Sequence, residues 1–231
     1  MSKTTYRTVT KLNENIIQCR LCPRLVEWRE KIAVEKRRQY INWDYWGKPV
    51  PGFGDPNAEV LIVGLAPAAH GANRTGRMFT GDQSGNWLYG ALHTFGFANQ
   101  PESTGRDDGM QLINCYITAS VRCAPPANKP EKTEFENCRP YLLQELQLLR
   151  NVRVIIALGK IAFDTVVTCT KNLQWTDFTK KPLFKHNQQV KIHENLYLVA
   201  SYHPSQQNTF TGKLTKRMFH SVFKRAATIL K

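Results

Sequence analysis

The sequence lacks the segments by which a chain crosses a membrane or is exported through one. No apolar run approaches the ~20 residues that a membrane-spanning helix needs. The N-terminal stretch MSKTTYRTVTKLNENIIQ (1–18) has no apolar core followed by small residues, so no signal peptide is expected. Internal repeats and Ser/Gly linkers are absent as well. The sequence thus predicts one cytoplasmic domain spanning 1–231, with a polar and basic N-terminal segment 1–54, and nothing in it demands more than a monomer.

Acidic residues are scarce relative to basic ones. Eighteen Asp and Glu stand against 32 Lys and Arg, which leaves a formal net charge of +14. Such an excess attracts polyanions, whereas balanced charges would serve solubility equally well. The basic residues are dispersed, with local clusters at 36–38 and 180–181. We therefore expect a nucleic acid, and no membrane, to bind a basic face of the folded chain.

The six cysteines do not form the pattern of a disulfide framework. Cys19 and Cys22 make a C-x2-C pair, but Cys123 and Cys138 stand far apart. A zinc ribbon normally closes with a second tight knuckle, which this chain lacks. An iron–sulfur cluster accepts thiolates from distant loops and fits the spacing better, although spacing alone leaves zinc open. The remaining two, at 115 and 169, are expected to be small buried hydrophobic residues.

Four short apolar runs predict buried strands, at 59–64, 114–121, 152–159 and 196–201. Helical patterns separate or follow them, at 86–95, 134–149, 161–167 and 213–230. Continuous apolar strands that alternate with amphipathic helices are typical of a parallel sheet covered on both faces. Ligands of such sheets sit beyond the carboxyl ends of the strands. The segments after Gly64, Ala119 and Ser201 should therefore line one shared opening at this edge of the sheet, which we call the mouth.

Two motifs are expected at that mouth. The stretch GLAPAAHGANRTGRMFTGD (64–82) follows the first strand, and its small residues let the backbone approach a ligand closely. It matches neither a Walker A loop nor a G-x-G-x-x-G fingerprint, so a nucleotide cofactor is not indicated. The stretch SYHPS (201–205) closes the fourth strand and brings the imidazole of His203 to the same edge. That position favours a functional role for His203 over a structural one.

Together with the cysteines, the pieces 64–82, VRCAPPANKP (121–130) and YHPS (202–205) resemble a type-b uracil-DNA glycosylase. This is the family-5 branch of the uracil-DNA glycosylase superfamily, and the resemblance runs from about Cys19 to the C-terminus. It implies a single three-layer α/β/α domain with a central four-stranded parallel sheet. It also implies monofunctional hydrolysis of the N-glycosidic bond of uracil in DNA, which leaves an abasic site. The resemblance assigns a [4Fe–4S] cluster to Cys19, Cys22, Cys123 and Cys138.

The same resemblance implies roles for individual residues. Phe79 matches the aromatic residue that stacks on the flipped base, and His203 the histidine that contacts it. Asp82 and Asn128 match polar positions assigned to catalysis or base contact. Independently of the resemblance, cleavage of the glycosidic bond leaves negative charge on the departing base. We expect His203 and backbone N–H groups of the Gly64–Gly71 loop, which contains Ala66, to stabilise that charge. Tyr202 and Arg77 are expected to position phosphate or backbone.

Two departures from the related type-a enzymes bear on the substrate. Leu65 occupies the position of an acidic residue, and Ala119 the position of an Asn that reads uracil. Both are typical of the type-b branch, which the resemblance links to broader substrates, including hypoxanthine and some damaged pyrimidines. Leu65 also keeps open a second function, a non-catalytic iron–sulfur DNA-binding module. A zinc-stabilised hydrolase is not supported, because G-x-S-x-G and H-E-x-x-H motifs are missing.

Several of these residues have structural alternatives. Asp82 precedes the helix expected from Asn86, and Asp is a favoured helix N-cap. Asn128 is also suited to bracing the loop that begins Pro125-Pro126. In the segment after His203, Phe210 or Leu214 is a candidate wedge for the stack that a flipped base vacates. The alternative is that these two side chains only hold the following helix in place.

Overall fold

The computed structural model describes residues 6–231. Residues 1–5, the start of the stretch in which no signal peptide is expected, lie outside the described residues. Within 6–231, no helix is both long enough and apolar enough to cross a membrane.

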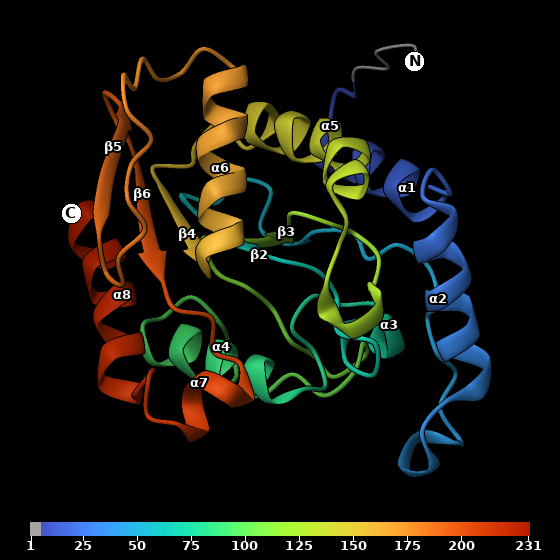
Figure 1. The fold of residues 1–231 in the computed structure, drawn as a ribbon. Coiled ribbons are helices and arrows are strands. Elements are labelled where there is room, and N and C mark those ends of the chain that lie inside the picture. The colour runs from blue at the N-terminus through green and yellow to red at the C-terminus, as the bar shows by residue number, and fades with distance from the viewer. Residues whose placement is uncertain (1–5) are drawn as a thin grey trace.

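The centre of the molecule is a sheet with the strand order β1-β3-β2-β4-β6-β5 (Figure 1). Its four inner strands run parallel and are almost entirely buried. They are β2 (Val60–Gly64), β3 (Cys115–Ala119), β4 (Val154–Leu158) and β6 (Leu196–Ser201). Each lies within a run predicted from its apolar character, so the parallel core of the sheet is confirmed.

The expected strand number of four is too low, because two antiparallel edge strands complete the sheet. β1 (Phe53–Gly54) pairs with β3, and β5 (Gln189–His193) pairs with β6. β1 is only two residues long and lies in a stretch rich in Pro and Gly. β5 is an edge strand in which Ile192 is the one fully buried side chain. A search for continuous apolar runs finds only strands buried on both faces, and it misses both of these.

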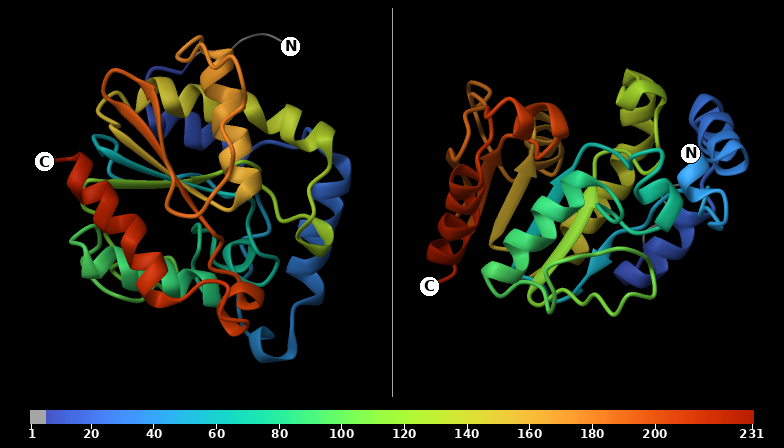
Figure 2. Two further views of the ribbon diagram at one scale, coloured as in Figure 1. Left: turned by 60° about the vertical axis from the view of Figure 1, so that its left-hand side comes forward. Right: turned by 90° about the horizontal axis from the view of Figure 1, so that it is seen from below.

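Helices cover both faces of the sheet, which confirms the three-layer α/β/α architecture (Figures 1 and 2). On one face, α4 (Gln83–Thr94) and α8 (Lys216–Ile229) contribute Leu88, Leu92 and Phe223 to the core. On the other face, α5 (Lys132–Leu148) and α6 (Lys160–Asn172) contribute Leu142 and Phe163. All four helices overlap predicted ones, although α6 continues for five residues beyond the predicted end at 167.

The N-terminal segment is helical, which its polar composition did not predict. It forms α1 (Val9–Ile17) and α2 (Pro23–Glu35), and Cys22 is the N-cap residue immediately before α2. The side chain of Asn13 on α1 donates to the Gly52 carbonyl at 3.2 Å and to the Tyr116 hydroxyl at 3.0 Å. Buried apolar residues on one side of α1 complete the packing against α5.

The carboxyl ends of the parallel strands all point to one edge of the sheet, the lower edge in Figure 1. The short helices α3 (Ala72–Thr75) and α7 (Gln206–Phe210) and the start of α4 gather there. Figure 2 (right) looks at this edge from below. The predicted mouth is therefore present, and the motifs at 64–82 and 201–205 both open onto it.

Candidate functional site

The mouth is built from loops that the sheet holds in register. Gly64 at the end of β2 lies opposite Ala119 at the end of β3. The Ser120 N–H and hydroxyl both donate to the Gly64 carbonyl, at 2.9 and 3.0 Å. On the other side, the Gly159 N–H donates to the Ser201 carbonyl at 2.8 Å. Backbone hydrogen bonds thus place the loops after β2, β3, β4 and β6 side by side.

Phe79 lies at the centre of this group in a strained conformation. Its φ is +56°, in the left-handed region that an aromatic residue rarely adopts. Such backbone costs on the order of 1–3 kcal/mol and is concentrated at functional sites. The ring lies against Gly64, where an added Cβ would come within 2.8 Å of it. Gly64 is therefore needed because the aromatic ring occupies the space that a side chain would fill.

His203 extends from the end of β6 toward the same ring. The centroids of the His203 and Phe79 rings are 6.2 Å apart, and the ring planes are inclined by 30°. The His203 carbonyl accepts a hydrogen bond of 2.8 Å from the Asn208 side chain, which links the histidine to α7. Gly159 gives it room, because a Cβ there would lie 3.3 Å from the His203 Cβ.

Burial lowers the pKa of His203 to about 4. Its imidazole is therefore neutral at pH 7, with one nitrogen as a donor and the other as an acceptor. A neutral imidazole can donate a hydrogen bond to a ligand without bringing a positive charge into the mouth.

Asp82 is the N-cap of α4, which is one of the two roles predicted for it from the sequence. Its Oδ1 accepts from the Gly85 N–H at 2.9 Å. Its other carboxylate oxygen, Oδ2, lies against Gly71, where any Cβ would collide with it. Burial raises the pKa of the Asp82 carboxyl, and the N–H groups of Gly85 and Ser84 oppose that rise. The capping bond thus uses one oxygen and leaves the other beside the 64–82 loop.

Other predicted substrate-binding residues lie around this centre in different surroundings. Ala119 is buried at the end of β3, and Ala66 packs against the cysteine-containing core. The Tyr202 ring packs against His186, with centroids 5.0 Å apart, and the Lys213 ammonium lies 5.4 Å from its centroid. Tyr202 is therefore held on the α7 side of the mouth.

Asn128 is not brought into contact with the other predicted residues. It ends the short turn Pro126–Asn128 with φ +55° and an exposed side chain. Within 6–231, its side chain makes no hydrogen bond, while its backbone N–H donates to the Pro125 carbonyl at 3.2 Å. The side chain therefore does not brace the loop.

Two expectations about DNA contacts are wrong. Arg77 is buried and pairs with Asp108 at 2.5 Å. It therefore stabilises the loop at 103–108 and is not available to bind a phosphate group of DNA. Leu214 is completely buried in the core and cannot act as a wedge. Phe210, at the end of α7, is 76% exposed. Apolar character alone could not separate Leu214 from Phe210, because both lie in the same polar segment.

The cysteines at the other side of the mouth form a small core of their own. Cys22, Cys123 and Cys138 pack together with Leu25 and Val121. Cys19 lies close enough for its charge to raise the pKa of the Cys22 and Cys123 thiols, after the larger effect of burial. The four predicted ligands are therefore neighbours, although they come from the segment between α1 and α2, the loop after β3, and α5.

Two side chains donate hydrogen bonds to these sulfur atoms. The guanidinium of Arg29, which is 1% exposed, donates to Cys123 Sγ at 3.2 Å. The Asn137 amide donates to Cys22 Sγ at 3.4 Å. Within the described residues, no three His, Cys, Asp or Glu side chains converge closely enough to hold a single metal ion. Cys115 and Cys169 lie in the two main cores, which confirms that they are buried hydrophobic residues.

Sequence reasoning missed the support behind the 64–82 loop. Arg74, which is 3% exposed, lies with its guanidinium carbon 4.0 Å from the Tyr40 ring centroid and 4.1 Å from that of Trp43. Tyr45 Oη lies 3.0 Å from His70 Nδ1. The aromatic run NWDYW (42–46) next to a basic cluster was the available signal.

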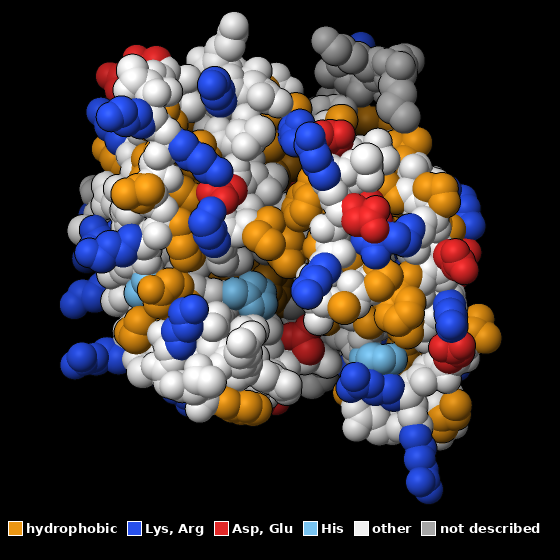
Figure 3. All heavy atoms as spheres, in the orientation of Figure 1, with side chains coloured by type: hydrophobic (Ala, Val, Ile, Leu, Met, Phe, Trp, Pro, Cys, Tyr) orange, Lys and Arg blue, Asp and Glu red, His pale blue; other side chains and the backbone are white. Residues whose placement is uncertain are grey.

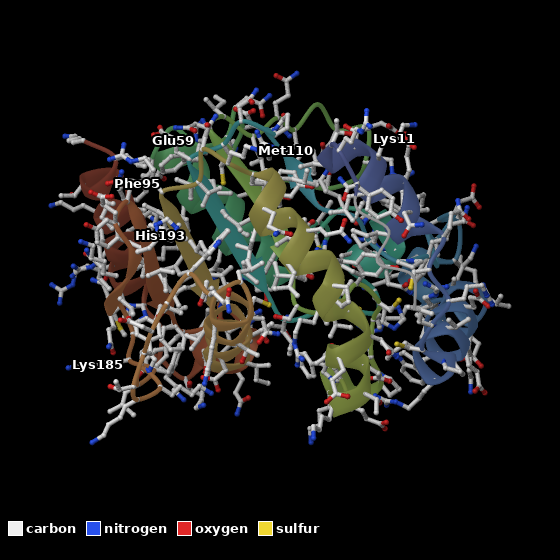
Figure 4. All side chains as sticks on the ribbon, turned by 90° about the horizontal axis from the view of Figure 1, so that it is seen from above. Lys11, Glu59, Phe95, Met110, Lys185 and His193 are labelled. Carbon is white, nitrogen blue, oxygen red and sulfur yellow. The ribbon has the colours of Figure 1, made fainter. Side chains whose placement is uncertain are left out.

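A polar hollow of about 680 Å³ lies at the opposite edge of the sheet, by Glu59 and His193 (Figure 4). Two of its charged residues already pair with each other, since Arg153 contacts Glu59 at 3.2 Å. Phe79 and His203 do not line it. The convergence of motif residues at the mouth therefore defines the candidate site better than the size of a cavity does.

Comparison with known proteins agrees with this arrangement. The sequence pattern of the "Uracil DNA glycosylase superfamily" matches residues 51–227, which include β2, the 64–82 loop and His203. The chain therefore belongs to the uracil DNA glycosylase superfamily.

Its relatives place it more closely. The chain is 49% identical over 220 residues to a "Type-5 uracil-DNA glycosylase" of Mycobacterium leprae, covering 95% of this chain and 94% of that protein. It is 46% identical to the protein of the same name from Thermus thermophilus, covering 92% and 94%. A "Type-4 uracil-DNA glycosylase" of Pyrobaculum aerophilum is 35% identical over 66% of this chain and 61% of its own length. Within the superfamily, the chain belongs to the type-5 family.

Proposed function

We propose that this protein is a base-excision-repair glycosylase that hydrolyses the N-glycosidic bond of uracil in DNA and leaves an abasic site. The observation that carries the proposal is the strained Phe79 ring, held against Gly64 and 6.2 Å from a neutral His203. Membership of the type-5 family and a net charge of +14 support it. As part of this proposal, the chain acts as one domain and as a monomer, in the cytoplasm, where its DNA substrate lies.

The base must leave the duplex before it can reach the mouth. Flipping costs a few kcal/mol and is easiest at a mismatch, such as uracil opposite guanine. Phe79 provides an aromatic face on which a planar base can stack. Ala119 belongs to the core that Phe79 packs against, and Ala66 lies on the loop after β2. Both side chains are methyl groups, so neither carries a group that would reject a purine. This is why we include hypoxanthine among the substrates.

Bond cleavage leaves an electron pair on the base and positive charge on the sugar. In the proposed mechanism, the C1′–N bond breaks and the departing base takes up the electron pair. His203 donates a hydrogen bond to this anion, and a pre-aligned donor of that kind contributes about 3–4 kcal/mol in a dry site. Backbone N–H groups of the Gly64 to Gly71 loop assist it.

Water completes the reaction at C1′. We propose that Asp82 orients this water through the carboxylate oxygen beside Gly71 and accepts its proton as the new C1′–O bond forms. Its negative charge also stabilises the cationic sugar. The core group of Gly64, Phe79, Asp82 and His203 contains no amine, which is consistent with a monofunctional enzyme that forms no Schiff base.

Asn128 and Tyr202 belong to the periphery of the proposed site. The Asn128 amide is exposed and unpaired within the described residues, so it is free to contact the base or sugar once DNA binds. Tyr202 lies beside Lys213 at the foot of α7, which suits a contact with the DNA backbone.

Phe210 is the proposed wedge. Its side chain is 76% exposed at the end of α7, and α7 is linked to His203 through Asn208. An exposed aromatic side chain at this position can fill the stack that the flipped base vacates.

We further propose that Cys19, Cys22, Cys123 and Cys138 hold a [4Fe–4S] cluster. Each iron of such a cluster takes one thiolate, so the ligands need not converge on a single point. The buried Arg29 fits an anionic occupant, since its Nε has no partner among residues 6–231 and its Nη1 already donates to Cys123. The cluster would supply a structural link between α2, the loop after β3 and α5. Nothing in the proposed hydrolysis requires electron transfer.

The first test is single-turnover cleavage of matched duplexes that carry uracil or hypoxanthine, read as alkali-labile sites. Anaerobically purified protein should contain iron and absorb broadly near ~400 nm. Cleavage of either base supports the glycosylase. DNA binding without cleavage, in iron-containing protein, would instead favour a non-catalytic damage-recognition module. Stoichiometric zinc without iron would reject the cluster.

A further inference from the structure

A basic and aromatic segment, which we call the arm (residues 36–48), lies next to the mouth and has no part in the proposed chemistry. It follows α2 and has the sequence KRRQYINWDYWGK. Four of its residues are basic, four are aromatic and only one, Asp44, is acidic. The arm forms the projection at the lower right of Figures 1 and 3, and Lys and Arg side chains are visible on it.

The inner side of the arm is anchored on the mouth. The Arg74 guanidinium, stacked on Tyr40 and Trp43, also donates to the carbonyls of His70 at 2.8 Å and Gly81 at 3.1 Å. A second stacking contact brings Arg106 to 3.9 Å from the Trp46 ring centroid. The arm is therefore held in a defined position relative to the 64–82 loop.

The outer side of the arm is exposed and positively charged. The side chains of Arg37 and Arg38 are exposed, and between 6 and 231 neither makes a salt bridge. Ile41 is 56% exposed and Trp43 39% exposed beside them. After the larger effect of burial, the positive charge of Arg37 lowers the pKa of His70, so this charge acts directly on the mouth loop.

The position of the arm relative to α7 indicates which part of a bound duplex would pass it. In Figure 1, α7 and the arm are separated along the lower edge of the molecule, where the elements of the mouth gather. A duplex whose flipped nucleotide enters the mouth, with Phe210 of α7 in the vacated stack, continues past the mouth in both directions. The arm lies where one of these continuations would pass. It carries exposed cations and an exposed aromatic ring, which are the groups that contact phosphates and bases.

We propose that the arm is a second DNA-contact surface, in which Arg37 and Arg38 bind the phosphate backbone where the duplex continues away from α7. The inference depends on the proposed function only in taking DNA as the occupant. Phosphate contacts of this kind position the duplex and add affinity without reading its sequence. The arm thereby connects DNA binding to the mouth loop that it braces.

The test compares Arg37→Ala/Arg38→Ala with the control Lys191→Ala/Lys231→Ala. The control removes the same charge from exposed residues of β5 and the C-terminus, on the far side of the molecule. Binding to an undamaged duplex is measured at several salt concentrations, alongside single-turnover uracil cleavage at several enzyme concentrations. Thermal melting of each variant confirms that it is folded.

We expect the arm variant to bind about tenfold more weakly and its log–log salt slope to fall by about 1.8, as for two lost phosphate contacts. The half-saturating enzyme concentration for cleavage should rise in parallel. The control should match the wild type, and Arg37→Lys/Arg38→Lys should restore the slope. Equal slopes for the arm variant and the control would overturn the proposal. If the wild type does not cleave uracil, the proposed function fails, but the salt slope still decides whether the arm binds DNA.

Discussion

Replacing Asp82 by Ser and, separately, by Ala distinguishes the two roles of this carboxylate. One oxygen caps α4 through the 2.9 Å bond from the Gly85 N–H, and the other is the proposed partner of water. Ser is as good an N-cap as Asp, whereas Ala removes the cap. Neither replacement carries a carboxylate. Stability and catalysis therefore respond differently to the same pair of variants.

The expected magnitudes follow from these contacts. Loss of a cap costs about 1 kcal/mol, which in a chain of this size lowers Tm by roughly 2–4 °C. Asp82→Ala should show that decrease, and Asp82→Ser should melt close to the wild type. Loss of a group that handles the proton of the attacking water slows the reaction by about 100-fold or more. Both variants should therefore lose single-turnover cleavage to a similar extent.

Two measurements are needed. The first is the single-turnover rate of cleavage of a uracil-containing duplex with enzyme in excess, and the second is the thermal melting temperature of each variant. Rescue of cleavage by Ser, but not by Ala, would refute the catalytic role and leave Asp82 as a helix cap only. Equal melting temperatures for the Ser and Ala variants would refute the energetic reasoning about the cap. The two halves of the prediction can thus fail independently.

Three further predictions concern other parts of the site. His203→Ala should slow cleavage by about 100-fold, and the wild-type contribution of His203 should be flat from pH 6 to 8, because its imidazole protonates only as the pH falls toward about 4. The same depressed pKa means that the stability linked to His203 is present above the ordinary value of 6.5 and is lost as the pH falls from there toward 4; a melting temperature that rises on acidification through this range would contradict it. Phe210→Ala should weaken binding to a mismatched duplex without changing Tm, whereas Leu214→Ala should cost about 2–5 kcal/mol of stability; equal binding by wild type and Phe210→Ala would remove the wedge. Arg29→Met should lower the iron content of anaerobically purified protein or speed bleaching near ~400 nm in air, while Arg20→Met, which changes an exposed arginine paired with Glu30, should match the wild type.

The parallel core of the sheet was predictable because burial on both faces leaves a local trace. Strands such as β4 must be apolar at every position, and a window of a few residues suffices to detect this. The edge strands β1 and β5 have no such requirement, since one side of each faces solvent or a loop. Helices α1 and α2 were missed because the N-terminal segment was interpreted from its polar and basic composition, although Val9, Leu12 and Ile16 of α1 do have helical spacing.

For the candidate site, the sequence by itself determined which residue types are available and that the loops after the parallel strands converge. The parallel direction of β2 and β6, and with it the shared edge at their carboxyl ends, follows from patterns that lie along the chain. Only the tertiary structure decided that Phe79 adopts φ +56°, that Asp82 caps α4, and that Arg77 and Leu214 are buried while Phe210 is exposed. These outcomes depend on contacts between residues far apart in sequence, such as Arg77 with Asp108 and Arg74 with Tyr40. The energy of each contact depends on the surroundings of both partners, and no pattern within either segment records it.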